Sequence, residues 1–375
     1  MTQKMEMVNL QKLHNRHKEE LHAAMLEVFE KGQFINGPQV GEFATNLGEF
    51  INSKYVIPCG NGTDALQLAL MALDLKPGDE VITTTFSFVA TAEVIALLGL
   101  KPVFVDVNDR TYNISPKAIE SAITERTKVI LPVHLFGQSA NMNAIMKIAE
   151  KHNLFVIEDA AQALGATYTI NRESKHVGTI GHIGCTSFFP SKNLGGFGDG
   201  GACFTQDEEL ANKIRTIANH GSTKRYFHDV TGVNSRLDTM QAAMLNVKLK
   251  YFTQALNARA ITGEHYNNQL IEIDEVLIPR NEPLANHTYN QYTIRVLKGK
   301  RDELKNFLQE KGIPSRVYYP LPLHKQKAFE NNSVSVFPLE NSDILSQEVL
   351  SLPIHTEMTK NDVNMIAKYI KDFFV

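Results

Sequence analysis

The stretch Leu154-Phe155-Val156-Ile157-Glu158-Asp159-Ala160-Ala161-Gln162 contains a short apolar run that ends in two acidic residues and a small-residue turn. A continuous apolar run of this length is typical of a strand buried on both faces of a parallel sheet. The run Val129-Ile130-Leu131 has the same character. We therefore predict two buried strands, with Asp159 just past the end of the second.

Short apolar runs alternate with helical patterns around this stretch. Strands are expected at Glu80–Thr84, Pro102–Val105, Lys128–Pro132 and Leu154–Ile157, and helices at 88–98, 115–123 and 141–151. This alternation predicts an α/β fold with a mostly parallel central sheet and helices on both faces. Further helical patterns cover 10–31, 39–52, 63–74 and 238–270.

The pattern changes beyond about residue 280. A strand-like run at 291–297, a helix at 301–311, a proline-rich loop from Pro314 to Pro322 and a helix at 359–373 follow. We predict a large α/β domain over residues 1–240, N-terminal helices included. A linking helix and a smaller α+β C-terminal domain would fill residues 241–375.

The composition argues against several classes of protein. The chain has 375 residues and a formal net charge of −3, so no overall positive charge favours nucleic acid or an anionic membrane. It has neither an apolar signal-peptide core near the start nor a long apolar stretch. Cys59, Cys185 and Cys203 are too scattered for a disulfide framework or a zinc site. We expect a cytoplasmic protein with no metal site and no nucleic-acid or membrane partner.

The segment Gly60-Asn61-Gly62-Thr63-Asp64-Ala65 joins a short apolar run to a helical pattern. Its glycines let the main chain approach a ligand closely, and the start of a helix offers free amide groups to a phosphate. The alternative is a tight turn in which Thr63 or Asp64 only caps the helix. The pattern by itself leaves both interpretations open.

A single lysine, Lys192, lies among the aromatic residues and glycines of 186–201. Because a partly apolar pocket disfavours the ammonium form, such a lysine becomes a usable amine nucleophile; an ordinary solvated lysine is the alternative. Gly196, Gly198 and Gly201 also match the GxGxxG pattern of dinucleotide sites. We reject that interpretation because the glycines precede a strand-like run and do not open a helix.

Asp159 lies where open α/β sheets place their ligands, at the carboxyl end of a strand. A helix cap is the alternative role for this carboxylate. A nucleophilic lysine, an acid at a strand end and a phosphate-binding loop are together the parts that pyridoxal 5′-phosphate requires. They predict that Lys192 forms a Schiff base with this cofactor, while Asp159 keeps the pyridine nitrogen protonated.

Several motifs resemble, in order and spacing, the DegT/DnrJ/EryC1/StrS family of pyridoxal-phosphate-dependent sugar aminotransferases. These motifs are Asp159–Gln162, Ser187–Lys192, Gly200-Gly201 and Gly232–Asp238. The resemblance runs from about Gln33 to the C-terminus. It implies aminotransferase fold type I.

The resemblance also implies how the ring of the cofactor is held. Lys192 would form the Schiff base and then move a proton, and Asp159 would pair with the pyridine nitrogen. Gln162 would hydrogen-bond the ring oxygen, and Phe88 would stack on the ring.

Other matching residues are implied to bind the phosphate. Thr63, the Gly62–Thr63 main chain and Ser187 would do so within one subunit. Asn234 would reach the cofactor of the neighbouring subunit, which implies a homodimer with shared active sites.

The implied reaction is a transamination. Some family members carry histidine in place of the Schiff-base lysine and dehydrate sugars, whereas this chain keeps Lys192. L-glutamate would give its amino group to the cofactor, which would then aminate a ketone on a nucleotide-linked sugar in a ping-pong reaction.

Similarity to particular members of the family suggests which sugar is the substrate. His134–Gln138 and Gln162 resemble members that aminate 3-keto sugars. Gly232–Ala243 and Tyr318–Gln326 look most like enzymes that aminate UDP-2-acetamido-2-deoxy-3-keto-D-glucuronate at C-3, for bacterial surface polysaccharide such as O-antigen or capsule. The residues expected to contact the substrate are Arg236, Tyr318, Tyr319 and His324, although close relatives often have histidine at the position of Tyr318.

Alternatives remain for the role of Arg236, for the sugar substrate and for the function as an enzyme. Arg236 could instead form a salt bridge with Asp238, and the further cations Lys224 and Arg225 are more typical of a solvated loop. The substrate could be a dTDP- or UDP-linked keto-6-deoxyhexose that is aminated at C-3 or C-4. A more distant alternative is a regulator that binds pyridoxal phosphate without turnover.

Overall fold

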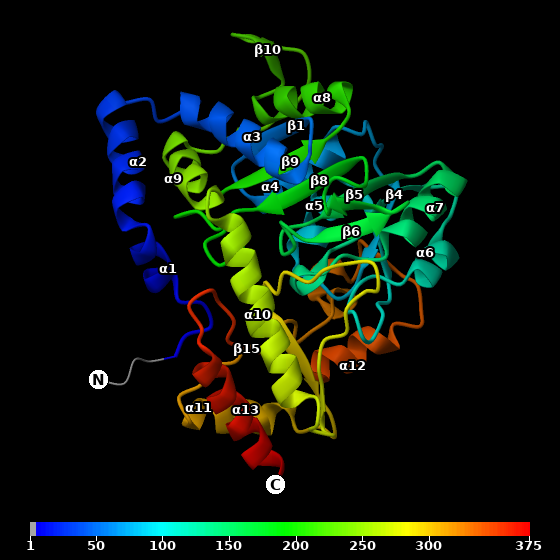
Figure 1. Ribbon diagram of the computed structural model, residues 1–375. Coiled ribbons are helices and arrows are strands. Elements are labelled where there is room, and N and C mark those ends of the chain that lie inside the picture. Colours follow the sequence, from blue (N-terminus) through cyan, green and yellow to red (C-terminus); the bar gives the residue numbers. More distant parts are fainter. Residues whose placement is uncertain (1–4) are drawn as a thin grey trace.

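The computed structural model describes residues 5–375 and has an eight-stranded sheet at its centre (Figure 1). The strands, in their order across the sheet, are β1 (Tyr55–Cys59), β9 (Gly201–Thr205), β8 (Ile183–Ser187), β5 (Phe155–Asp159), β4 (Thr127–Leu131), β2 (Glu80–Thr84), β3 (Lys101–Val105) and β14 (Val334–Ser335). Strand β9 is antiparallel to both of its neighbours, and the remaining pairs are parallel. The predicted mostly parallel sheet is confirmed.

Helices cover both faces of this sheet, as the apolar strands require. Val129, Leu131 and Ile157 pack on one face, where the helices are α4 (Gly62–Met71), α5 (Ala90–Leu97) and α8 (Glu208–Ala218). Ile130 and Val156 point to the opposite face, where the helices are α6 (Pro116–Ala122) and α7 (Met142–His152). Because parallel strands end at the same edge, this packing brings the loops after β4, β5 and β8 together.

Two helical stretches that the sequence pattern presents as continuous are each broken into two helices. The stretch 10–31 forms α1 (Leu10–Arg16) and α2 (Lys18–Lys31), and 238–270 forms α9 (Thr239–Leu249) and α10 (Phe252–Leu270). The breaks fall at His17 and at Lys250 and Tyr251, and the rings of His17 and Tyr251 stack with their centroids 3.8 Å apart. The contact between His17 and Tyr251 therefore lies at both breaks. Helix α3 (Pro38–Ile51) packs beside α9.

The C-terminal part contains a second sheet of three antiparallel strands, β12 (Val276–Leu277), β13 (Tyr292–Val296) and β15 (Val349–Leu352). Its core includes Tyr266, Ile294, Leu304, Leu350 and Ile366. The helices α11 (Arg301–Glu310) and α13 (Lys360–Phe374) lie beside it, and α10 runs from the central sheet to this part (Figure 1). Helix α12 (Glu340–Glu348) precedes β15, and β14 from this half of the chain extends the central sheet.

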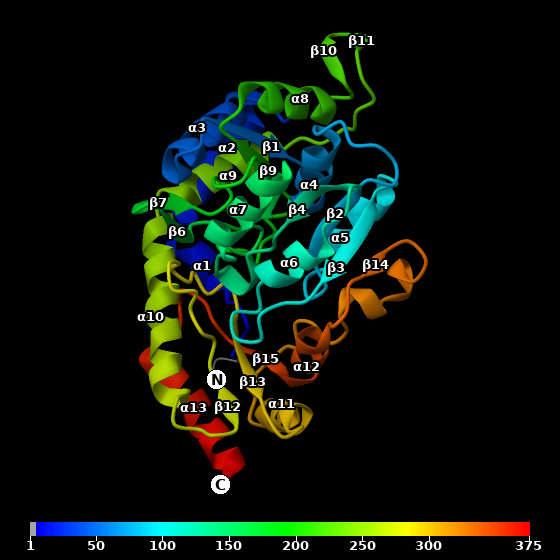
Figure 2. The same ribbon diagram turned by 90° about the vertical axis from the view of Figure 1, so that its right-hand side faces the viewer.

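Short elements complete the described chain. The hairpins are β6 (Thr167–Ile170) with β7 (Glu173–His176), and β10 (Ser222–Lys224) with β11 (Phe227–His228). The 3-10 helices are η1 (Leu135–Gly137), η2 (Leu323–Lys325) and η3 (Lys327–Phe329). The β10–β11 hairpin projects from the end of the molecule beyond α8 (Figure 2). Within residues 5–375, no helix has the length and apolar character that crossing a bilayer requires.

Asp106 joins the central sheet to helix α12. Its carboxylate accepts the amide of Asn341 at 2.9 Å, and both the amide at 2.9 Å and the hydroxyl at 2.6 Å of Ser342. These amides lie in the first turn of α12, where a helix has no acceptors of its own. Asp106 therefore caps this helix from a distant part of the chain.

We expect Asp106→Ala to lower the free energy of unfolding by about 2–3 kcal/mol, because three donors, two of them buried, lose a charged acceptor. Urea unfolding measures the change. Glu209→Ala is the matched control, since its side chain is 81% exposed; it should change stability by less than about 0.5 kcal/mol. Equal effects of the two substitutions would contradict the capping role.

Candidate active site

Asp159 is the last residue of β5 and is almost fully buried. Its carboxylate accepts hydrogen bonds from the Thr91 hydroxyl at 2.9 Å and from the Ala161 amide at 3.2 Å. Burial raises the pKa of Asp159, whereas these hydrogen bonds and the positive charge of Lys192 oppose the rise. A buried carboxylate with so few donors favours a cationic partner, and a protonated ring nitrogen provides one.

Lys192 lies in the connection from β8 to β9, which we call the lysine loop (residues 188–200). Burial lowers the pKa of Lys192, and the negative charge of Asp159 partly offsets this effect. A lowered pKa increases the fraction of neutral amine, which is the nucleophilic form. The fold therefore brings together the two residues on which the predicted cofactor chemistry depends.

The start of helix α4 forms a cup against the end of β8. Asn61 caps the helix by accepting the Asp64 amide at 2.8 Å, and the first amides of a helix have no acceptor within it. A Cβ atom at Gly62 would lie 2.7 Å from the Cβ of Ser187, so only glycine fits this approach. The Gly62 and Thr63 main chain and the Ser187 side chain thus border one small site that suits a phosphate.

The segment 234–236 of the same chain lies beside this cup. The Ser235 hydroxyl accepts the Gly60 amide at 3.0 Å and donates to Asp64 at 2.6 Å. The side chain of Asn234 is exposed to solvent, and Arg236 is partly buried. Among residues 5–375, no carboxylate lies within 4.0 Å of Arg236, so the salt bridge with Asp238 does not form.

Aromatic and amide groups line the side of the site nearest the C-terminal part. The ring of Phe88 is 55% exposed, and its centroid lies 6.4 Å from that of Tyr319. The Gln162 side chain donates to the Tyr319 hydroxyl at 3.1 Å and accepts the Phe136 amide at 2.7 Å. Gln162 and Tyr319 are therefore held together, and the exposed ring of Phe88 is available to stack on a planar ligand.

The other two residues expected to contact the substrate differ in their surroundings. Tyr318 is partly buried and lies 5.9 Å from Tyr319 between ring centroids. His324 Nδ1 is 2.7 Å from the Thr85 hydroxyl, and its Nε2 is 3.4 Å from Asp343. The His324 side chain is only 6% exposed. These contacts join η2 to the residue that follows β2 and to helix α12, so His324 would act on a substrate mainly by supporting its neighbours.

Sequence reasoning missed Thr91, which donates directly to Asp159, and the pair formed by His134 and Glu158. His134 Nε2 and Glu158 Oε2 are 2.8 Å apart, and both side chains are fully buried. Glu158 also accepts the amides of Gly178, Ile180 and Gly181. The available signal was the acidic residue inside an apolar strand, because a buried carboxylate must find several donors.

These residues fit pyridoxal phosphate. The cup at α4 suits its phosphate, Asp159 suits its ring nitrogen, and Lys192 suits its aldehyde. The part of the chain that the structure describes contains no cluster of three or more histidine, cysteine or acidic residues able to hold a metal ion.

Comparisons with known proteins agree with this site. The model of the DegT/DnrJ/EryC1/StrS aminotransferase family matches residues 15–371. The chain is 44% identical to a pleiotropic regulatory protein of Geobacillus stearothermophilus, over 98% of each chain. It is also 44% identical to the UDP-2-acetamido-2-deoxy-3-oxo-D-glucuronate aminotransferase of Pseudomonas aeruginosa, over 96% of this chain and 98% of the relative.

Solved structures of relatives have the same fold. A DegT DnrJ EryC1 StrS aminotransferase from Brucella abortus superposes with a TM-score of 0.94 at 42% identity, covering 98% of this chain and 99% of the other. NtdA from Bacillus subtilis, solved with bound cofactor PMP, superposes with a TM-score of 0.89 at 32% identity, covering 99% of this chain and 86% of the other. The chain belongs to the DegT/DnrJ/EryC1/StrS aminotransferase family and is a pyridoxal-phosphate-dependent sugar aminotransferase of fold type I.

Proposed function

We propose that the enzyme transfers the amino group of L-glutamate to C-3 of UDP-2-acetamido-2-deoxy-3-oxo-D-glucuronate. The observation that carries this proposal is the 44% identity, over nearly the whole chain, to an aminotransferase named for that substrate. A 3-amino uronate linked to UDP suits the synthesis of bacterial surface polysaccharide, such as O-antigen or capsule, in the cytoplasm.

The proposed roles of the residues follow from their surroundings. When bound, pyridoxal phosphate supplies an aldehyde that takes up the amino group and a ring that withdraws electrons from the reacting carbon. Lys192, with its lowered pKa, provides the amine that holds the cofactor and then moves the proton at Nζ. Asp159 stabilises a positive ring nitrogen, and Phe88 covers the ring from its exposed position.

The phosphate and the sugar need different contacts. The Gly62 and Thr63 main chain with Ser187 would hold the cofactor phosphate. Arg236 has no carboxylate partner among the described residues, so its guanidinium is free to bind the uronate carboxylate. Tyr319 and Tyr318 would border the sugar, with Gln162 fixing the first of them.

A second candidate substrate is UDP-N-acetyl-3-dehydro-α-D-glucosamine, which lacks the carboxylate. A 3-aminotransferase named for that sugar, from Acidithiobacillus ferrooxidans, is 42% identical over 94% of each chain. Arg236 favours the uronate, because a guanidinium pairs well with a carboxylate.

The substrate assignment predicts a preference that depends on charge. With L-glutamate as donor, we expect kcat/KM for the UDP-linked 3-oxo uronate to exceed that for the neutral 3-oxo sugar by about 10- to 100-fold, since one charged contact is worth that much. Product masses identify the aminated sugar. Arg236→Ala should remove most of this preference, and Arg172→Ala, which changes an exposed arginine of the β6–β7 hairpin, should leave it unchanged.

Two results would contradict the assignment. Amination of a 4-oxo-6-deoxy sugar alone would place the enzyme in another branch of the family. The absence of any conversion, including the half-reaction with glutamate, would favour the regulatory alternative.

We further propose a homodimer in which Asn234 reaches the neighbouring active site. Asn234 is exposed, and the β10–β11 hairpin, which projects from the molecule (Figure 2), follows α8 a few residues before it. This hairpin carries the exposed rings of Tyr226 and Phe227. Such exposed apolar groups are typical of surfaces that bind another chain. The exposed Lys224 and Arg225 lie over these rings.

Mixing two inactive variants tests this arrangement. Lys192→Ala removes the lysine, and Asn234→Asp places a negative charge where the phosphate is expected. If Asn234 serves the other subunit, an equal mixture that exchanges subunits regains about a quarter of the wild-type activity. The reason is that about half of the dimers are then mixed, and one of the two sites in each mixed dimer is intact. If each chain serves its own site, mixing restores nothing.

A further inference from the structure

Two side chains of helix α9 form hydrogen bonds with the main chain of the lysine loop. The Gln241 side-chain oxygen accepts the Phe197 amide at 2.7 Å. The Lys248 ammonium donates to the Gly195 carbonyl and lies 5.6 Å from the centre of the Phe197 ring. Because the two residues are seven positions apart, they lie on the same face of the helix, two turns from each other.

The held segment is tied closely to the turn that carries Lys192. The Lys192 amide donates to the Phe189 carbonyl at 2.8 Å, and the Gly196 amide donates to the Phe188 carbonyl at 2.7 Å. A Cβ atom at Gly195 would lie 2.2 Å from the Pro190 carbonyl oxygen, so the two ends of the turn touch. A displacement of Gly195 would therefore displace Lys192.

Lys248 is an unusual residue for this position. Within residues 5–375, no carboxylate lies within 4.0 Å of its ammonium group, and burial together with the nearby positive charge of Arg259 lowers the pKa of Lys248 to about 8. A partly buried cation without a counter-ion costs free energy. Its hydrogen bond to Gly195 and its contact with the Phe197 ring are the interactions that offset this cost.

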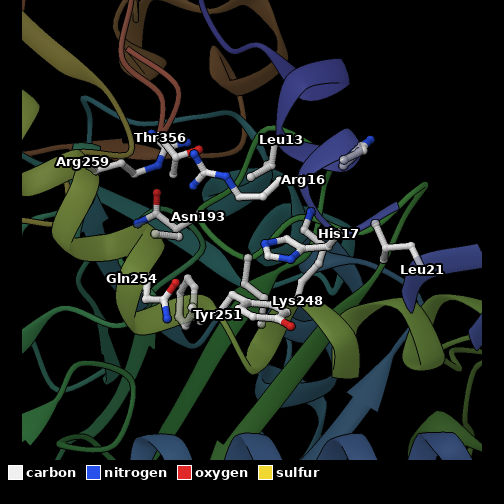
Figure 3. A pocket seen from close by; sticks show the side chains of 14 residues that line it. Leu13, Arg16, His17, Leu21, Asn193, Lys248, Tyr251, Gln254, Arg259 and Thr356 are labelled. Carbon is white, nitrogen blue, oxygen red and sulfur yellow. The ribbon is translucent and has the colours of Figure 1, made fainter. Parts of the chain in front are cut away.

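The surroundings of Lys248 separate it from the reacting groups. Figure 3 shows the small cavity behind the lysine loop, with Asn193 from the loop, Lys248 from α9 and Arg259 from α10 around it. Its internal space is about 40 Å³, which accommodates about one water molecule. His14 of α1 stacks on Phe197, with centroids 4.2 Å apart. None of the residues expected to hold the cofactor or the substrate lines this cavity.

We propose that Lys248 is a positioning residue for Lys192: by holding the Gly195 carbonyl, it keeps the amine of Lys192 in place to bind the cofactor covalently. This inference rests on the proposed role of Lys192. It assigns to a residue outside the cofactor site a part in forming the covalent bond, and no part in binding the phosphate or the ring.

The test compares two forms of the cofactor. Pyridoxal phosphate binds through its phosphate, its ring and the bond to Lys192, whereas pyridoxamine phosphate lacks the aldehyde and cannot form that bond. We expect Lys248→Met to weaken the affinity of the apoenzyme for pyridoxal phosphate about tenfold and for pyridoxamine phosphate less than about twofold, because a hydrogen bond to a charged group has been removed from the lysine loop alone. Calorimetric titration measures both affinities.

Matched variants separate the outcomes. Lys250→Met changes a lysine that is 63% exposed near the end of the same helix and should alter neither affinity. Equal losses for both cofactor forms in Lys248→Met would show a general packing role and overturn the proposal, as would unchanged affinities. If Lys248→Met does not fold, Gln241→Ala is measured instead, because it removes the side chain that accepts the Phe197 amide of the lysine loop. The affinities for pyridoxal phosphate and pyridoxamine phosphate are then compared in the same way.

Lys192→Ala separates the role of Lys192 from the role of Lys248. It should abolish the visible absorption band of bound pyridoxal phosphate and keep affinity for pyridoxamine phosphate. If the band persists in Lys192→Ala, the assignment of Lys192 fails. If the band is lost there but Lys248→Met binds both forms normally, only the role of Lys248 fails.

Discussion

The constraint on which the site depends is a pair of opposite charges at one edge of the central sheet, of which Asp159 is buried and Lys192 is partly buried. Asp159 ends a strand whose neighbours are apolar on both faces, and Lys192 lies on the loop after the next strand across the sheet. Burial raises the pKa of Asp159 and lowers that of Lys192, and each charge partly stabilises the other. A protonated ring nitrogen bound beside Asp159 suits this carboxylate electrostatically.

Most of the central sheet could be predicted because its strands are short apolar runs separated by helical patterns. The strand expected at Glu80–Thr84 has those bounds in the structure, and the other three central strands differ by one or two residues. Contacts between distant residues explain the differences elsewhere: the stacking of His17 on Tyr251 accompanies the broken helices. Strand β14 joins the sheet only through tertiary contact with β3, and helices α8 and α12 were not anticipated.

The candidate site was predictable where local sequence carries the chemistry. Local patterns predicted a role in the site for Asp159, Lys192 and the Gly62–Thr63 turn, each for a stated physical reason. The family resemblance added Gln162, Phe88 and Asn234 to the predicted site. The supporting contacts were not predictable, because they join side chains far apart in the chain. Thr91 reaches Asp159 across 68 positions, and Lys248 reaches Gly195 across 53.

Chemical trapping on the wild-type enzyme tests the central claim most directly. The enzyme is saturated with pyridoxal phosphate, reduced with borohydride and digested, and the labelled peptide is identified by mass spectrometry. The account predicts a pyridoxyl group on Lys192 and on no other residue. A label on Lys248, which also has a lowered pKa, or on any other lysine, or the absence of a label, would contradict it.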